Sequence, residues 1–114
     1  MITIYHNPRC SKSREGLELL KGTGEDFKVR EYLKEPLSEE ELTDLLEKLS
    51  MAPIELVRTD EKVWKENYKN RDLSDEELVQ VMIEHPRLIQ RPIVVKGQTA
   101  VVGRPVSRIT SLLN

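Results

Sequence analysis

The order of strand-like and helix-like segments constrains this chain most strongly. Residues 1–5 are apolar and β-branched, which predicts a short buried strand. A helix is expected from Ser11, with Gly22 and Gly24 as its stop signals. Residues 27–33 alternate apolar and polar side chains, which predicts a second strand. A strand–helix–strand crossover of this kind normally makes a parallel pair.

The middle of the chain predicts a helical, acidic segment at about residues 38–85. Ser38 with Glu41, and Ser74 with Glu77, each show the capping-box spacing that starts a helix. One or two further short helices are expected between these two.

The last part of the chain predicts a β-hairpin and a closing helix. Residues 93–96 and 99–102 are rich in β-branched side chains and flank Gly97-Gln98, the pattern of a two-residue turn. Residues 106–113 then predict a helix.

Without the helical segment, these elements read βαβ followed by ββα. This order predicts an α/β fold with a thioredoxin-like core and a helical insertion at about residues 38–85. At 114 residues, the chain is expected to form a single domain, residues 1–114, with a core of its own.

Charge is distributed unevenly along the chain. The 18 basic and 20 acidic residues give a net charge of −2. Residues 1–14 nevertheless carry +3 and residues 85–114 carry +5, because all the acids lie between them. If the two ends meet in the fold, they build a positive patch. The alternative is that the arginines of the ends are solvated at strand and loop surfaces.

The composition also excludes several classes of protein. The near-neutral charge gives no indication of nucleic-acid binding. No apolar run approaches the ~18–20 residues of a membrane-spanning helix, and no secretory signal begins the chain. We therefore expect a cytoplasmic protein that binds neither nucleic acid nor membrane.

Cys10 is the only cysteine, which excludes an intramolecular disulfide and a multi-cysteine zinc site. It precedes the first predicted helix and lies near Arg9, Lys12 and Arg14. A helix N-terminus and nearby cations both stabilise a thiolate, so we expect a thiol pKa below the usual ~8.5. The alternative is an inert cysteine that serves as a small apolar side chain.

Two Arg-Pro pairs, Arg91-Pro92 and Arg104-Pro105, lie in the basic C-terminal part. Their arginines could bind a tetrahedral oxyanion beside Cys10, because a guanidinium can donate to two oxygens at once. The alternative for each is a solvated surface arginine. If the fold is thioredoxin-like, Pro92 stands where such folds carry a cis-proline that faces the active cysteine.

Three segments resemble the glutaredoxin-coupled arsenate reductase (ArsC-like) family: Tyr5–Arg14, Leu88–Val95 and Gly103–Pro105. The resemblance covers essentially the whole chain in the same order. It implies an enzyme of arsenic detoxification that reduces arsenate to arsenite. It further implies that the redox-active Cys10 forms a covalent thiol–arsenate adduct. Glutathione would be a co-substrate rather than a bound cofactor, and glutaredoxin would be a transient partner.

The resemblance also assigns residues to the site. It implies that Arg58, Arg91 and Arg104 bind the oxyanion, and Arg14 matches a motif position that could orient the anion or the thiolate. His6 corresponds to a motif histidine thought to help activate the cysteine, or it only caps the turn after the first strand. Ser13 could orient the thiolate.

The cysteine count supports an external reductant. Reduction of arsenate takes two electrons, and one cysteine cannot supply both by forming a disulfide with another in the chain. The phosphatase-like arsenate reductases need Cys-x5-Arg, but Gly16 is the sixth residue after Cys10. A metal site at His6 and His85 is not expected, because two histidines and one cysteine form no recognisable ligand spacing.

Two other functions remain open. One is an arsenate-reductase-like thiol oxidoreductase of unknown substrate. The other is an Spx-type regulator that binds RNA polymerase. The regulator is less favoured, because Ser13 replaces the second cysteine of its Cys-x-x-Cys switch.

Overall fold

A computed structural model describes all residues, Met1 to Asn114. The chain divides into two compact units, of which the first comprises Met1–Glu35 and Arg91–Asn114 and the second comprises Pro36–Gln90. The two basic ends of the sequence therefore belong to the same unit, as one of the two charge interpretations requires.

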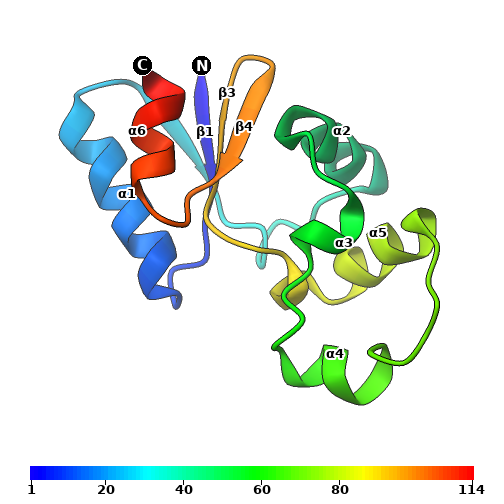
Figure 1. Cartoon of the computed structure of the whole chain (residues 1–114). Helices are drawn as coiled ribbons and strands as arrows, with labels where there is room; N and C mark the ends of the chain where they lie inside the picture. Colours follow the sequence, from blue (N-terminus) through cyan, green and yellow to red (C-terminus); the bar gives the residue numbers. More distant parts are fainter. The chain divides into compact units, whose positions relative to one another are not determined.

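The first unit is built on a four-stranded sheet with the strand order β2-β1-β3-β4 (Figure 1). β1 (Ile2–Tyr5) pairs in parallel with β2 (Phe27–Arg30), and α1 (Ser11–Thr23) connects them. β3 (Ile93–Lys96) and β4 (Thr99–Val102) form an antiparallel hairpin, and β3 also pairs antiparallel with β1. The predicted crossover, hairpin and thioredoxin-like order are confirmed.

The second strand is shorter than predicted, because it ends at Arg30 rather than at residue 33. The chain turns immediately afterwards, where the N–H groups of Lys34 and Glu35 donate to the Glu31 carbonyl at 3.0 and 2.9 Å. Tyr32 is buried in this turn. The end predicted at residue 33 was wrong, because Glu31 already breaks the alternation of Phe27 and Val29 and Tyr32 is out of phase with them.

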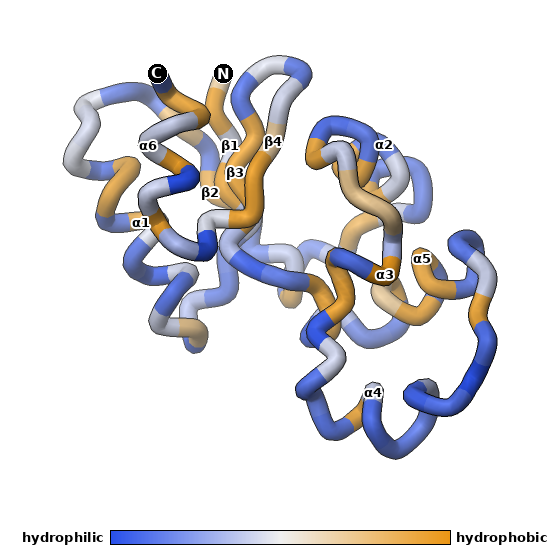
Figure 2. Tube along the Cα trace, viewed as in Figure 1, coloured by the Kyte–Doolittle hydropathy of each residue, from blue (hydrophilic) through white to orange (hydrophobic).

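One face of the sheet is covered by α1 and by α6 (Ser107–Leu113), as Figure 1 shows. The buried cluster between them consists of Ile2, Ile4, Leu20, Val94 and Ile109. Each such side chain contributes about 1.5–3 kcal/mol when it is fully buried. Figure 2 shows the apolar colour of β3, one of the two inner strands of the sheet. The core holds the start of α1 and the end of β4 in fixed positions, and both bear on the site.

The second unit contains the predicted helices and no strands. Its elements are α2 (Glu39–Leu49), α3 (Pro53–Leu56), α4 (Lys62–Asn67), α5 (Asp75–Glu84) and the 3-10 turn η1 (Pro86–Leu88). The buried leucines of α2 and the buried apolar side chains of α5 form the predicted apolar faces. The two short helices α3 and α4 confirm the prediction for the segment between the capping boxes.

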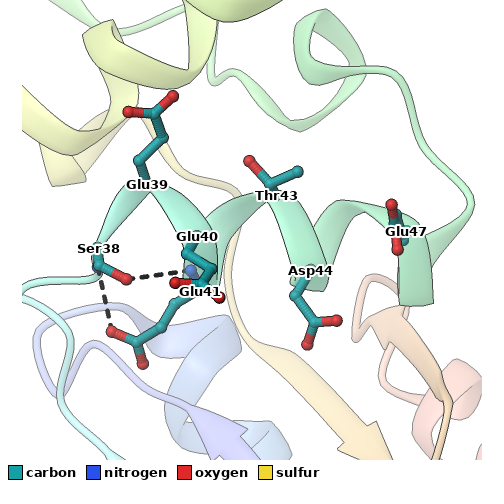
Figure 3. Close-up of a pocket in the computed structure, with 7 residues that line it drawn as sticks. All are labelled: Ser38, Glu39, Glu40, Glu41, Thr43, Asp44 and Glu47. Atoms are coloured by element: carbon teal, nitrogen blue, oxygen red, sulfur yellow. Dashed lines mark hydrogen bonds between the residues drawn. The ribbon is translucent and has the colours of Figure 1, made fainter.

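Both predicted capping boxes are present. In α2 the Ser38 Oγ accepts the N–H of Glu41, and the Glu41 carboxylate accepts the N–H of Ser38, both at 3.1 Å (Figure 3). Ser74 and Glu77 form the same pair at the start of α5. Figure 3 also shows the row of acidic side chains that continues along α2. None of the helices is both long enough and apolar enough to cross a bilayer.

Candidate active site

Cys10 is the N-cap residue of α1, with extended backbone angles of φ −95° and ψ 123°. The turn before it is closed by the Cys10 N–H, which donates to the Asn7 carbonyl at 3.0 Å. The Cys10 carbonyl then accepts the N–H of Arg14, also at 3.0 Å. The first turn of α1 holds no acidic residue. Its N–H groups and the helix dipole therefore favour an anion at this end.

The thiol of Cys10 has a pKa of about 7, below the 9.0 of an unperturbed thiol. Burial raises this pKa, but a hydrogen bond from the backbone N–H of Ser13 lowers it. Hydrogen bonds from the Arg91 and Arg104 side chains, together with the charge of Arg91, lower it further. The thiolate, which is the reactive form, is therefore well populated at neutral pH. This is the direction expected from the sequence.

The two Arg-Pro pairs meet at Cys10. Arg104 donates from Nη2 to the Cys10 Sγ at 3.5 Å and from Nε to the Arg91 carbonyl at 2.8 Å. Arg91 is only 7% exposed, so its charge acts on the thiol with little screening by water. The Arg91–Pro92 and Arg104–Pro105 peptide bonds are both cis, the first as the fold led us to expect. The structure thus brings together two of the predicted oxyanion-binding arginines and the predicted nucleophile.

Ser13 and His6 form a buried hydrogen-bonded pair beside this sulfur. The Ser13 Oγ lies 2.7 Å from the His6 Nδ1 and accepts the N–H of Asn7 at 3.0 Å. Burial lowers the pKa of His6, which favours the neutral imidazole. A neutral imidazole with its proton on Nε2 accepts the Ser13 hydroxyl proton at Nδ1. Ser13 thus contacts His6 through its hydroxyl and Cys10 through its backbone N–H. The role of His6 in activating the cysteine stays a prediction.

The basic neighbours of Cys10 in the sequence are directed elsewhere. The Arg14 guanidinium donates to the Pro8 carbonyl at 2.9 Å, and its side chain is exposed. Lys12 forms an exposed ion pair with Glu15 at 3.7 Å, and Arg9 is exposed. The cations that lower the thiol pKa are those of residues 91 and 104 instead. The role of Arg14 at the oxyanion stays a prediction.

Arg58 belongs to the second unit, just after α3. Its N–H donates to the Leu88 carbonyl at 2.6 Å, and its guanidinium pairs with the Glu61 carboxylate at 3.1 Å. The side chain is 16% exposed, so this ion pair is only partly screened by solvent. The role of Arg58 in binding an oxyanion stays a prediction.

Comparison with known proteins identifies the family. Residues 5–112 match the model of the ArsC family. The chain belongs to the ArsC family. The predicted resemblance is therefore confirmed, and the matched residues include Cys10 and both Arg-Pro pairs.

Relatives of this ArsC-family chain match it over nearly its full length. The uncharacterised protein YfgD of Escherichia coli strain K12 is 45% identical, over 98% of this chain and 96% of its own. A protein of Haemophilus influenzae named arsenate reductase is 40% identical, over 98% of each chain. A solved structure described as arsenate reductase from Vibrio cholerae is similar with a TM-score of 0.91 and 43% identity. That match covers 96% of this chain and 95% of the other, and it confirms the fold class.

Asn7 is a residue of this ArsC-family site that the sequence alone did not single out. It is only 5% exposed, its side-chain oxygen accepts the N–H of Arg9 at 3.0 Å, and its backbone contacts both Cys10 and Ser13. Asparagine favours turns in which its side chain bonds to the backbone two residues on. That preference, applied to the His-Asn-Pro segment, is the signal that could have identified Asn7 as the residue that organises the loop.

The structure contains no group of three or more His, Cys, Asp or Glu side chains that could hold a metal ion. The second histidine, His85, ends α5 and pairs through Nε2 with the Tyr68 hydroxyl at 3.1 Å. Both histidines of this ArsC-family chain therefore have partners within their own units.

Proposed function

We propose that this chain reduces arsenate to arsenite with Cys10 as the nucleophile. The observation that carries the proposal is a thiol of pKa about 7 beside two arginine side chains that both contact its sulfur. A thiolate repels an incoming oxyanion unless cations offset the negative charge of both. Arg91 and Arg104 supply two positive charges at that point, and the N–H groups of α1 add to them.

The proposed reaction balances as follows. The Cys10 thiolate attacks arsenic and an oxygen leaves as water, which gives an S–As bond with arsenic still pentavalent. The thiol of glutathione then attacks the Cys10 sulfur and forms an S–S bond. The S–As electron pair passes to arsenic, which leaves as trivalent arsenite. Two thiols have lost two electrons, and arsenic has gained them.

Glutaredoxin completes the cycle in this proposal. Its thiolate attacks the glutathione sulfur of the mixed disulfide and releases Cys10. The single cysteine supports this step, because the chain contains no second thiol to resolve the disulfide internally. The proposed location is the cytoplasm, where glutathione and glutaredoxin keep thiols reduced.

The test is arsenite formation by the purified protein with arsenate, glutathione and active glutaredoxin. We expect turnover with the natural sequence and none above background with Cys10→Ser. Replacement of the exposed Arg108 by alanine serves as the matched control and should leave turnover unchanged. Absence of arsenite with the natural sequence would contradict the proposal. Turnover of a glutathione mixed disulfide in its place would favour the alternative thiol oxidoreductase.

Arg58 is proposed as the third oxyanion-binding arginine, on the strength of the family resemblance. We expect Arg58→Ala to raise the KM for arsenate while leaving the pKa of Cys10 unchanged, because the cations that lower this pKa are Arg91 and Arg104. Lys62→Ala is the control, since Lys62 is an exposed cation of the same unit. An unchanged KM in Arg58→Ala would remove Arg58 from the site.

A further inference from the structure

Two glycines of the first unit enclose the ring of Pro92. Gly16 lies within α1, and Gly103 follows β4. A Cβ atom on Gly16 would lie 2.9 Å from the Pro92 Cγ and 3.1 Å from the Ile109 Cδ1. A Cβ atom on Gly103 would lie 3.0 Å from the same Pro92 Cγ and 2.8 Å from the Ile109 Cδ1. Carbon atoms in optimal contact are about 3.5–4.0 Å apart, so neither position has room for a methyl group.

The requirement for glycine at residue 16 comes from Pro92 and not from the helix. Alanine is more favourable than glycine inside a helix. Gly22 lies in the same helix, and a Cβ atom there would meet nothing within 4 Å. The ring of Pro92 is rigid, whereas the Ile109 Cδ1 is the end of a flexible side chain. A methyl group on residue 16 would therefore have to displace the proline.

A movement of Pro92 would also move the two arginines of the site. Its carbonyl accepts the N–H of Gly103 at 2.8 Å, and Arg91 is its direct neighbour in the chain. The Arg91 carbonyl accepts the Arg104 Nε at 2.8 Å, and the same guanidinium reaches the Cys10 Sγ at 3.5 Å. A shift of the proline ring would therefore be transmitted to both guanidinium groups.

We propose that Gly16 and Gly103 are positioning residues, which set the distance of the Arg91 and Arg104 guanidinium groups from the Cys10 sulfur by admitting the Pro92 ring between α1 and the end of β4. The glycines touch neither the sulfur nor an oxyanion. Their effect passes through Pro92. This inference rests on the proposed function only in taking these arginines to be the ones that hold the substrate.

The test is a pH titration of the Cys10 thiolate by its ultraviolet absorbance, which is unambiguous because the chain has one cysteine. In Gly16→Ala we expect the pKa to rise by roughly one unit from its value of about 7, because the arginines are drawn away from the sulfur. Gly22→Ala, in the same helix, should titrate like the natural sequence. A Gly16→Ala variant that is folded and titrates unchanged would overturn the proposal.

A second variant separates positioning from loss of packing. Ile109→Val removes the methyl group nearest to both glycines without pushing on Pro92, so it should lower stability and leave the thiol pKa unchanged. If Gly16→Ala alone does not fold, the double variant Gly16→Ala/Ile109→Val gives room beside residue 16 while keeping the contact with Pro92. It should show the raised pKa. A pKa equally raised in Ile109→Val alone would overturn the proposal.

The titration is carried out without arsenate, glutathione or glutaredoxin. A failure to reduce arsenate would therefore not affect the result of the titration. Conversely, an unchanged pKa in Gly16→Ala would contradict the positioning role of the glycines but not the arsenate reaction. If both proposals hold, Gly16→Ala also raises the KM for arsenate several-fold relative to Gly22→Ala.

Discussion

The helices α1 and α2 begin in different ways. α2 starts with Ser38, whose oxygen accepts the N–H of the third helical residue, and its first turn carries three glutamates. α1 starts with Cys10, which supplies no side-chain oxygen as a cap, and its first turn holds no acid. α5 repeats the pattern of α2 with Ser74 and three acidic residues.

The difference shows how a helix start can serve stability or chemistry. Glu41 in α2 and Ser13 in α1 occupy the same third position of their helices. In α2 the N–H of that residue is held by a serine oxygen, whereas in α1 it stabilises the ionised sulfur of Cys10. A cap and three carboxylates satisfy the positive end of α2. α1 leaves its positive end open for the thiolate and for a bound anion.

The two compact units that contain these helices also differ in net charge. Residues 36–90 carry fourteen acids and seven bases, and the other unit carries six acids and eleven bases. In the helical unit, the acids gather at helix starts, where each stabilises the helix by about 0.3–1 kcal/mol. In the unit with the sheet, the two arginines nearest the sulfur lie in the acid-free C-terminal segment.

The largest expected effect is a loss of stability that should be greater for Ser13→Ala, in α1, than for Ser38→Ala, at the start of α2. Ser13→Ala leaves the buried His6 Nδ1 and Asn7 N–H without their partner, so we expect it to lower the free energy of unfolding by about 2–3 kcal/mol. Urea denaturation measures this loss. A cost no greater than that of Ser38→Ala, an exposed cap, would remove the distinction between the two helix starts.

The next effect concerns the cations that contact the Cys10 sulfur at the start of α1. Arg104→Ala removes a hydrogen bond to the Cys10 sulfur, so the thiol pKa should rise by roughly one unit, equivalent to about 1.4 kcal/mol. The pH dependence of alkylation by iodoacetamide reports this pKa. Arg108→Ala, an exposed substitution on α6, is the control. Alkylation profiles that coincide for Arg104→Ala and the natural sequence would contradict the role of Arg104.

A smaller effect links the thiol to stability through pH. Because the folded pKa of Cys10, about 7, is below the unfolded value of 9.0, the unfolded chain holds more protons between these pH values. The free energy of unfolding therefore rises from pH 7 to pH 9 relative to Cys10→Ser, and this gain disappears as the pH falls through 7. Since solvent screens the partly exposed sulfur, we expect a gain of about 1 kcal/mol. Parallel stability profiles for the two proteins would contradict the linkage.

The smallest expected effect concerns the start of α2, which is capped by a serine. Ser38→Ala removes the cap of α2 and should lower the free energy of unfolding by roughly 0.5–1 kcal/mol. The thiol pKa of Cys10 should not change, because its shift has its causes within the first unit. Urea denaturation and thiol titration of the same sample measure both quantities. A shifted thiol pKa in this variant would show that the cap of α2 affects the site.

Local patterns predicted most of the secondary structure. Both capping boxes, the α1 helix and the hairpin at Gly97 follow from short-range chemistry, such as the φ of +63° that Gly97 adopts in the turn. The end of β2 was predicted three residues too late, because Glu31 already interrupts the alternation and the following Tyr32 is buried in a turn. Its burial depends on tertiary packing, which periodicity does not contain.

The sequence by itself determined the order of the elements and the helix start at Cys10, because these depend on neighbouring residues. The count of one cysteine also predicts an external thiol. Only the tertiary structure decided which cations act on the sulfur. The adjacent Arg14 turns to the Pro8 carbonyl, whereas Arg104, far away in the chain, reaches Cys10. The pairing of β1 with β3 brings the two ends of the chain together, and the glycines beside Pro92 let the arginines approach the sulfur. Such contacts join residues distant in sequence, so no local pattern encodes them.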